Sequence, residues 1–153
     1  MTTDRPLQAD LKPFGEVCYG CGQNNPHGLR IQSRWEGDEA VCTWQPEAHH
    51  QSAPGILNGG VIATLIDCHS GTAAVAAAYR AEGRPMGSAP DIVMLTASLL
   101  VEYLKPTPLA APVQLRAKVT ELTARKAVLD CSLRSGGVET ARGHVVMVRP
   151  RGS

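Results

Sequence analysis

One aspartate stands inside a long apolar segment that opens with two adjacent glycines. Asn58 precedes Gly59 and Gly60, and Val, Ile, Leu and Ala then fill most of positions 61–78, with Asp67 as the carboxylate among them. Asparagine suits a helix N-cap, because its side-chain oxygen accepts a hydrogen bond from a backbone N–H one turn further on. The segment therefore predicts a buried helix whose first glycine amides stay free for a ligand.

These residue types suit chemistry on a carbonyl group. Glycine is a poor helix former, so Gly59 and Gly60 indicate that another group approaches the backbone closely. Unpaired N–H groups at a helix start stabilise negative charge on an oxygen, and a lone carboxylate among apolar side chains suits a general base or a nucleophile. The competing interpretation is that Asp67 pairs with a neighbouring cation and that Asn58 is only a helix cap.

The spacing within this helix predicts a site shared by two chains. Asp67 follows Gly60 by seven residues, which places it on nearly the same face and about 10 Å further along the axis. One carbonyl group cannot contact both residues within a single helix. Two antiparallel copies of the helix across a two-fold axis would bring Asp67 of one chain to the glycines of the other. We therefore expect a homodimer, with a dimer of dimers as the larger alternative.

The elements that must position these residues form one domain after a short arm. A chain of 153 residues with 43% hydrophobic residues has the size and composition of one domain. Residues 1–28 indicate an N-terminal arm, with a helical turn near 8–12 and a compact loop, and residues 29–150 the domain. The pattern predicts a hairpin at 29–44, a central strand at 92–104, strands at 113–119, 127–133 and 138–148, and loops at 45–57 and 79–91. Such an order is typical of an α+β fold with an antiparallel sheet.

Two cysteines in the arm, Cys18 and Cys21, have the spacing of one half of a zinc knuckle. The further candidates Cys42, His49 and His50 have no standard ligand spacing. We therefore predict two buried or half-buried thiols with no metal, and solvated side chains for the two histidines. The chain has five cysteines, an odd number that favours free thiols over a disulfide framework.

Charge and hydropathy exclude several classes of function. The formal net charge of +1 gives no basic field of the kind that a nucleic-acid-binding protein needs. Residues 1–6 are polar and lack the apolar core of a signal peptide, and no run is expected to span a membrane. We therefore expect a cytoplasmic protein with neither a nucleic-acid nor a membrane partner.

Three stretches together resemble one family. Asn58-Gly59-Gly60-(six residues)-Asp67 is similar to the helix-start motif of hotdog-fold acyl-CoA thioesterases of the phenylacetate-pathway type, within the 4-hydroxybenzoyl-CoA thioesterase superfamily. That motif usually reads His-Gly-Gly-(six residues)-Asp. The stretches 18–22 and 25–29, Cys-Tyr-Gly-Cys-Gly and Asn-Pro-His-Gly-Leu, resemble the opening of one branch of the family, and 96–99 with 103–106 its strand after the helix. The resemblance covers about residues 15–149.

The resemblance implies five or six antiparallel strands wrapped around the long helix, and a dimer with acyl-CoA between the subunits. By position, Asp67 matches the catalytic acid that activates water or attacks directly, and Gly59 the residue whose amide polarises the thioester carbonyl. Thr96 matches a hydroxyl that helps to place the water, and Ser52 a polar, water-positioning side chain. Asn58 stands where histidine is usual and still allows a capped helix with an oxyanion hole.

We therefore expect hydrolysis of an acyl-CoA thioester to a free acid and CoA, without a metal or bound cofactor. Gly60 would assist Gly59. Arg125 and Lys126, near a strand end, would bind the CoA phosphates. The alternative is that these two side chains are ordinary charged residues of a solvent-exposed face. The main alternative is an acyl-CoA-binding protein of the same fold with weak or no catalysis. Two further alternatives are a hotdog-fold hydratase acting on enoyl-CoA and a zinc-dependent interaction protein that uses Cys18 and Cys21.

Overall fold

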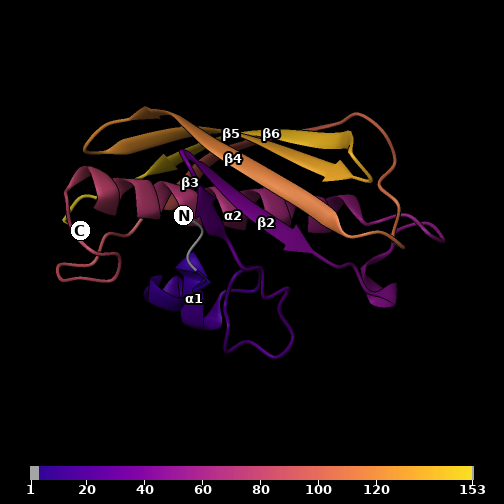
Figure 1. Ribbon diagram of the computed structural model, residues 1–153, viewed down its shortest axis with the longest axis horizontal. Coiled ribbons are helices and arrows are strands. Elements are labelled where there is room, and N and C mark those ends of the chain that lie inside the picture. The colour runs from indigo at the N-terminus through magenta and orange to yellow at the C-terminus, as the bar shows by residue number, and fades with distance from the viewer. Residues whose placement is uncertain (1–3, 153) are drawn as a thin grey trace.

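A six-stranded antiparallel sheet lies over one long helix, α2, in a computed structural model that describes residues 4–152 (Figure 1). The sheet order is β1-β2-β4-β5-β6-β3. The strands are β1 (Arg34–Glu36), β2 (Glu39–Trp44), β3 (Leu95–Tyr103), β4 (Val113–Leu122), β5 (Lys126–Ser135) and β6 (Val138–Val148), and the helices are α1 (Phe14–Val17) and α2 (Gly59–Ala81). This arrangement is the expected hotdog fold.

Helix α2 begins as the sequence predicts and is the core of the molecule. The Asn58 side-chain oxygen caps it by accepting hydrogen bonds from two backbone N–H groups in the first turn. The helix runs three residues beyond the predicted end at position 78. By length and composition it could also cross a membrane, contrary to the expectation that no run would. Most of its apolar stretch is buried against the sheet, which explains that composition without a bilayer.

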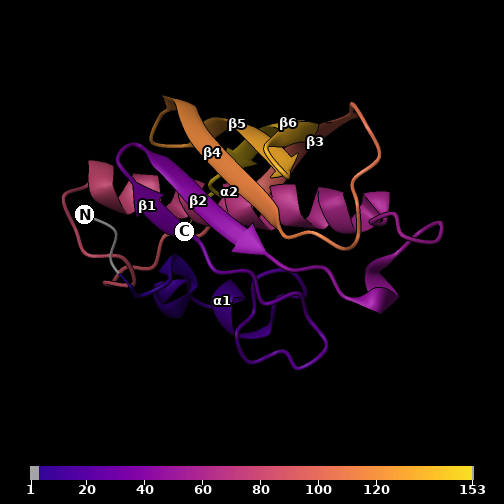
Figure 2. The same ribbon diagram turned by 45° about the vertical axis from the view of Figure 1, so that its right-hand side comes forward.

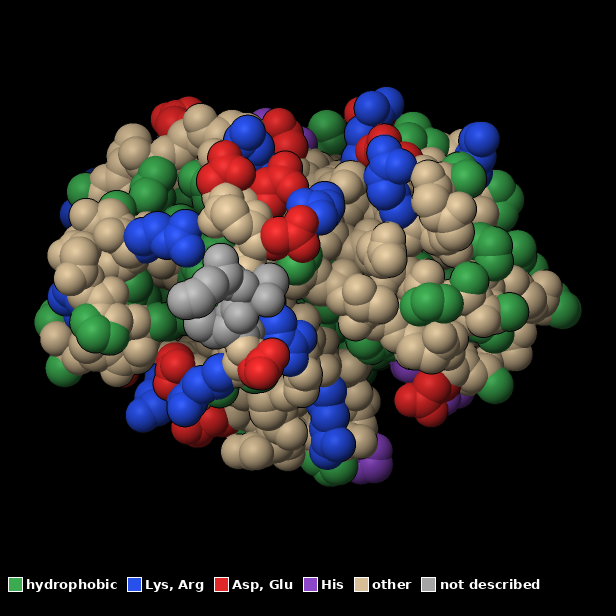
Figure 3. All heavy atoms as spheres, viewed as in Figure 1, with side chains coloured by type: hydrophobic (Ala, Val, Ile, Leu, Met, Phe, Trp, Pro, Cys, Tyr) green, Lys and Arg blue, Asp and Glu red, His purple; other side chains and the backbone are tan. Residues whose placement is uncertain are grey.

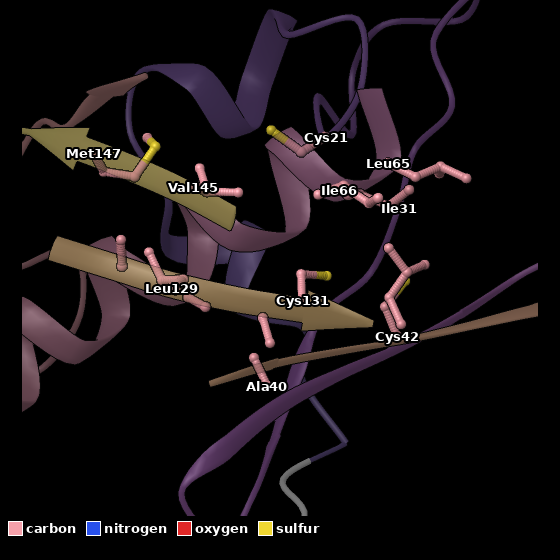
Figure 4. Close-up of a cluster of buried hydrophobic side chains, with 14 of the residues drawn as sticks. Cys21, Ile31, Ala40, Cys42, Leu65, Ile66, Leu129, Cys131, Val145 and Met147 are labelled. Carbon is pink, nitrogen blue, oxygen red and sulfur yellow. The ribbon is translucent and has the colours of Figure 1, made fainter. Parts of the chain in front are cut away.

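The inner face of the sheet packs closely on α2. Alternate residues of β4, β5 and β6 are buried, as a period of two requires when one face is covered. Figure 4 shows Leu65 and Ile66 of the helix facing the same core as Leu129 and Val145 of the strands. At Gly143 a Cβ atom would collide with the Ile66 side chain, so glycine there lets the helix approach the sheet.

The N-terminal arm covers the side of α2 that faces away from the sheet (Figures 1 and 2). A 3-10 helix at Leu7–Asp10 and the short α1 form its first part, as the predicted helical turn and compact loop suggested. Backbone hydrogen bonds from Leu29 to Tyr19 and from Ile31 to Gly20 close the loop that follows. Residues 29–33 are therefore paired with the arm, and the predicted hairpin strand begins only at Arg34.

Strand β3 is an edge strand and not the expected central one. Within residues 4–152 it pairs with β6 alone, and most of its residues are exposed, among them Leu95, Leu100 and Tyr103 at 45%, 57% and 54%. The apolar run at 92–104 predicted a strand that the helix covers on one face. Hydrophobicity along the chain does not distinguish such a strand from an exposed edge strand. An edge of this kind is a surface on which another strand can pair.

The visible outer surface carries charges of both signs. Figure 3 shows Lys and Arg side chains interspersed with Asp and Glu. Many are paired across strands, as where Arg116 of β4 bonds to Glu36 and Glu39 at 2.6 Å each. These exposed pairs contribute little stability individually.

Candidate active site

Asp67 projects from α2 toward the edge strand β3. Thr96 Oγ1 donates a hydrogen bond of 2.6 Å to Asp67 Oδ1. Among the described residues 4–152, no lysine, arginine or histidine lies within ion-pair distance of Asp67. The carboxylate is thus not one half of a structural salt bridge, which was the competing interpretation, and Thr96 holds it in one orientation.

The surroundings of Asp67 favour its neutral form. Partial burial raises the pKa of Asp67 above its ordinary value, and the hydrogen bond from Thr96 opposes that rise. Negative charge on the nearby Cys18 sulfur adds to the rise. A carboxylate with a raised pKa is a stronger base once it is ionised, so the site favours proton transfer over ion pairing.

A cavity of about 170 Å³ lies against Asp67. The arm forms one wall, while α2, the end of β6 and the start of β3 form the others. Its apolar lining comes from Leu11, Phe14, Val75, Met94, Leu95 and Met147, and Asp67, Thr96, Cys18, Cys21 and Cys68 supply oxygen and sulfur atoms. A cavity with apolar walls and a carboxylate at its edge suits an apolar group attached to a reactive carbonyl.

The start of α2 offers one free backbone donor in place of two. Asn58 Oδ1 accepts from the Gly60 N–H at 2.8 Å and from the Val61 N–H at 3.1 Å. The expectation that both glycine amides stay free is therefore wrong for Gly60, whose N–H is used by the cap. No hydrogen bond within residues 4–152 takes up the Gly59 N–H. Gly59 is thus the candidate oxyanion donor, and Asn58 positions it.

Tyr103 is a residue of this site that the sequence did not single out. Its hydroxyl donates to the Gly59 carbonyl oxygen at 2.7 Å. A Cβ atom added at Gly59 would lie 3.3 Å from the Tyr103 ring. The small size of Gly59 therefore accommodates the Tyr103 ring. The signal available in the sequence was only the family-like stretch that begins at Tyr103.

Asp67 and Gly59 do not meet within one protomer. They lie eight residues apart on one helix, about 12 Å along its axis, and Gly59 is not among the residues that line the Asp67 cavity. Both residues are partly exposed, on the side of α2 bordered by β3. One protomer therefore does not bring Asp67 and Gly59 to the same carbonyl group.

Three of the predicted binding residues lie away from Asp67. Ser52 is exposed in the loop before α2, where its hydroxyl donates to the Ile56 carbonyl oxygen at 3.4 Å. Lys126 pairs with Glu121 at 3.1 Å, and Arg125 lies in the turn between β4 and β5, at the far end of α2. The structure brings none of Ser52, Arg125 and Lys126 to the cavity of its own chain.

Two histidines, His69 and His50, have structural roles, while His49 is exposed as predicted. His69 is fully buried; its Nδ1 lies 2.7 Å from Ser33 Oγ and its Nε2 lies 3.0 Å from the Ala40 carbonyl oxygen. It faces away from Asp67, as its offset on the helix predicts. His50 is buried rather than solvated, because its Nδ1 accepts the Glu47 N–H at 2.9 Å and its ring packs on Trp44. The solvated prediction for His50 is therefore wrong.

The thiols of the arm differ from those of the core. Burial raises the pKa of Cys42 to about 11 and that of Cys131 to about 12, as expected for small apolar side chains. The pKa of Cys18 is instead lowered to about 5, chiefly by a hydrogen bond from the Cys68 thiol. The pKa of Cys68 is raised for the same reason. Both cysteines line the cavity beside Asp67.

Comparison with known proteins agrees with this fold. The family model of the thioesterase superfamily matches residues 54–142, which contain α2, β3, β4 and β5, and the chain belongs to this superfamily. The solved thioesterase superfamily protein of Shewanella loihica PV-4 is 35% identical, with a TM-score of 0.65 over 78% of this chain and 90% of that one. A hypothetical thioesterase of Streptococcus pneumoniae, solved with coenzyme A, shares the fold at 16% identity and a TM-score of 0.65, over 78% of this chain and 85% of that one.

A curated relative carries an activity in its name. Acyl-coenzyme A thioesterase THEM4 of Xenopus laevis is 36% identical over 95 residues, which are 62% of this chain and 37% of the relative. The match thus spans little more than a third of that relative.

Proposed function

We propose that this protein hydrolyses an acyl-CoA thioester to a free acid and CoA. The observation that carries this proposal is an ion-pair-free carboxylate, Asp67, held by Thr96 at the mouth of an apolar cavity. Membership of the thioesterase superfamily and the name of the THEM4 relative support the substrate class.

The reaction needs a base and an oxyanion donor on opposite sides of one carbonyl. Asp67 accepts a proton from water as the water oxygen attacks the thioester carbon, and Thr96 keeps the carboxylate oriented. The Gly59 N–H of the second chain stabilises the negative oxygen of the tetrahedral intermediate. Collapse of this intermediate breaks the carbon–sulfur bond, and the CoA sulfur leaves with the proton that Asp67 had taken. Direct attack by Asp67 through an anhydride is the alternative course.

The edge strand β3 supports a shared site. It carries Thr96 and Tyr103, which hold Asp67 and Gly59 respectively, and it is exposed along most of its length. Pairing of β3 with its copy would cover its apolar side chains and bring the two α2 helices together in antiparallel orientation. We therefore propose a homodimer as the active form, and a dimer of dimers as a further assembly.

The first experiment measures the release of free CoA from a panel of acyl-CoAs by the wild type and by Asp67→Asn. This change keeps the shape of the side chain and removes its charge, so we expect turnover to fall by at least about 100-fold. A matched control is Asp91→Asn, a change at an exposed loop aspartate, which should leave turnover unchanged. Equal turnover by the wild type and Asp67→Asn would refute the assignment.

The second candidate function is acyl-CoA binding without turnover. Asn58 favours it, because histidine is usual at this position in the family that the motif resembles. Tight acyl-CoA binding by the wild type, with no CoA release above that of Asp67→Asn, would select binding over hydrolysis.

We also propose the type of thioesterase and the compartment in which it works. The helix-start motif supports the phenylacetate-pathway type of thioesterase. The five free cysteines within the described residues support a reducing compartment such as the cytoplasm.

A further inference from the structure

A third thiol joins the Cys18 and Cys21 pair from the central helix. The sulfur atoms of Cys18 and Cys68 lie 3.7 Å apart, although 50 positions separate the two residues in the sequence. The Sγ atoms of Cys18, Cys21 and Cys68 all lie within 4.8 Å of one another. No spacing pattern in the sequence links the arm to Cys68, so the folded chain creates this cluster.

The backbone around the cluster requires small residues. A Cβ at Gly20 would collide with the Cys68 sulfur, and one at Gly22 would collide with the backbone of Cys18. The Gly22 N–H donates to the Cys18 carbonyl oxygen at 2.8 Å, which closes a tight turn. These glycines allow the arm to present two sulfur atoms to a third on α2.

The turn also prepares one sulfur as an acceptor. The backbone N–H groups of Gly20 and Cys21 lie beside the Cys18 sulfur and favour its negative charge. Amide groups placed in this way orient a metal-bound thiolate. The core thiols of Cys42 and Cys131 are instead buried within the sheet, away from this cluster.

The distances fit a tetrahedral thiolate site. Zinc–sulfur bonds of about 2.3 Å in tetrahedral geometry place neighbouring sulfur atoms about 3.8 Å apart. The Cys18–Cys68 separation already matches that edge. Closing the longest separation in the cluster needs a movement on the order of 1 Å. Three soft sulfur ligands favour zinc over magnesium or calcium.

We propose that Cys18, Cys21 and Cys68 bind one zinc ion as three thiolates and so fasten the N-terminal arm to α2 beside Asp67. All three cysteines line the cavity, so a water molecule or another small ligand from the cavity completes the tetrahedron. This inference does not depend on the thioesterase activity. It differs from the sequence-based prediction of two metal-free thiols, because Cys68 supplies the ligand that the sequence pattern lacked.

Co²⁺ is the first probe, because it occupies zinc sites and its absorption spectrum depends on its ligands and their geometry. The full-length protein, reduced and freed of metal with a chelator, is titrated with Co²⁺ under exclusion of oxygen. We expect saturation at one ion per chain, with intense thiolate-to-cobalt charge-transfer bands and the ligand-field bands of tetrahedral geometry, and loss of both when Zn²⁺ is added. Zinc should also protect Cys18, Cys21 and Cys68 of the wild type from alkylation, as mapped by mass spectrometry.

Variants locate the site. Cys21→Ala and Cys68→Ala should each weaken Co²⁺ binding by more than the roughly 10- to 100-fold that loss of an outer partner of a metal ligand causes. Cys42→Ala removes a buried thiol outside the cluster and should bind as the wild type does. The wild-type spectra and alkylation map do not depend on the variants folding. Spectra without thiolate bands, equal binding by Cys68→Ala and the wild type, or no metal bound by the fully reduced protein would each overturn the proposal.

Discussion

Thr96 donates a hydrogen bond of 2.6 Å to Asp67, and the same strand, seven residues on, holds Gly59 through Tyr103. One edge strand thus positions both the carboxylate and the helix start of the candidate site. A displacement of β3 would disturb the base and the oxyanion donor together. We therefore expect the activity to depend on how this edge strand is held in place.

The hydrogen bond from Thr96 should set the acid limb of the pH–rate profile. Burial raises the pKa of Asp67 and the bond from Thr96 lowers it, so Thr96→Val should move the acid limb of kcat/KM to higher pH. Activity requires ionised Asp67, and it is therefore lost at a higher pH in this variant than in the wild type. Loss of about 1.4 kcal/mol of hydrogen bonding also predicts a decrease in kcat on the order of 10-fold.

Thr96→Ser is the matched control, because it retains the hydroxyl. Its profile should follow that of the wild type. A Thr96→Val profile that overlays the wild-type curve would show that the bond does not act on the group that limits the rate.

Asn58 should contribute to stability as a cap and to catalysis only through the position of Gly59. Its side chain accepts from Gly60 and Val61, so Asn58→Ala should lower the free energy of unfolding by about 1 kcal/mol, as measured by urea denaturation. Asn58→Asp keeps the cap and should unfold like the wild type. It also puts a negative charge beside the oxyanion, so its kcat should fall although its stability does not. Equal kcat values for Asn58→Asp and the wild type would remove the helix start from the mechanism.

His69 should make the fold less stable in mild acid. Gln8 donates to Ser33 Oγ at 2.8 Å, so the Ser33 hydroxyl is free to donate to His69 Nδ1, while His69 Nε2 donates to Ala40. This chain of bonds satisfies the neutral ring alone. Burial accordingly lowers the pKa of His69 from 6.5 to about 4.

The unfolded chain therefore takes up a proton as the pH falls through 6.5, whereas the folded chain does so only near pH 4. The contribution of His69 to the free energy of unfolding is fully present above pH 6.5. It decreases below that pH, by an amount on the order of 3 kcal/mol at pH 4. Urea unfolding in the presence of a chelator, at several pH values between 7.5 and 4.5, measures this slope. His69→Gln should show a flatter slope, and an unchanged slope would assign the acid sensitivity to other groups.

Sharing of the site between chains can be tested with mixed dimers. Asp67→Asn and Gly59→Val should each be inactive as homodimers. In a heterodimer of the two, one site combines an intact Asp67 with an intact Gly59, so random mixing should restore about a quarter of wild-type turnover. Coexpression with two affinity tags isolates the heterodimer. If the purified heterodimer stays inactive, each chain works alone and the β3 interface has no catalytic part.

The sequence predicted those parts of the molecule that local patterns encode. The Asn58 cap, the long helix and the strands at the end of the chain follow from capping chemistry and hydrophobic periodicity, which act within a few residues. The position of β3 at the edge could not be predicted, because a continuous apolar run looks the same in an exposed edge strand and in a strand that a helix covers. The meeting of Cys18 with Cys68 and of Tyr103 with Gly59 depends on contacts across more than 40 residues, which no spacing rule reaches.

Phe14 should limit the length of the acyl group. It lies on α1, at the arm side of the cavity beside Asp67, so Phe14→Ala should lengthen the cavity without touching the carboxylate. The ratio of kcat/KM for an eight-carbon acyl-CoA to that for a four-carbon one should rise at least 10-fold, since each methylene that gains a pocket contributes about 1–3 kcal/mol. Val17→Ala is the matched control on the same short helix, because Val17 is 71% exposed and does not line the cavity. If both variants keep the wild-type ratio, the acyl group binds elsewhere; if both change it, the arm as a whole, and not the Phe14 side chain, sets the specificity.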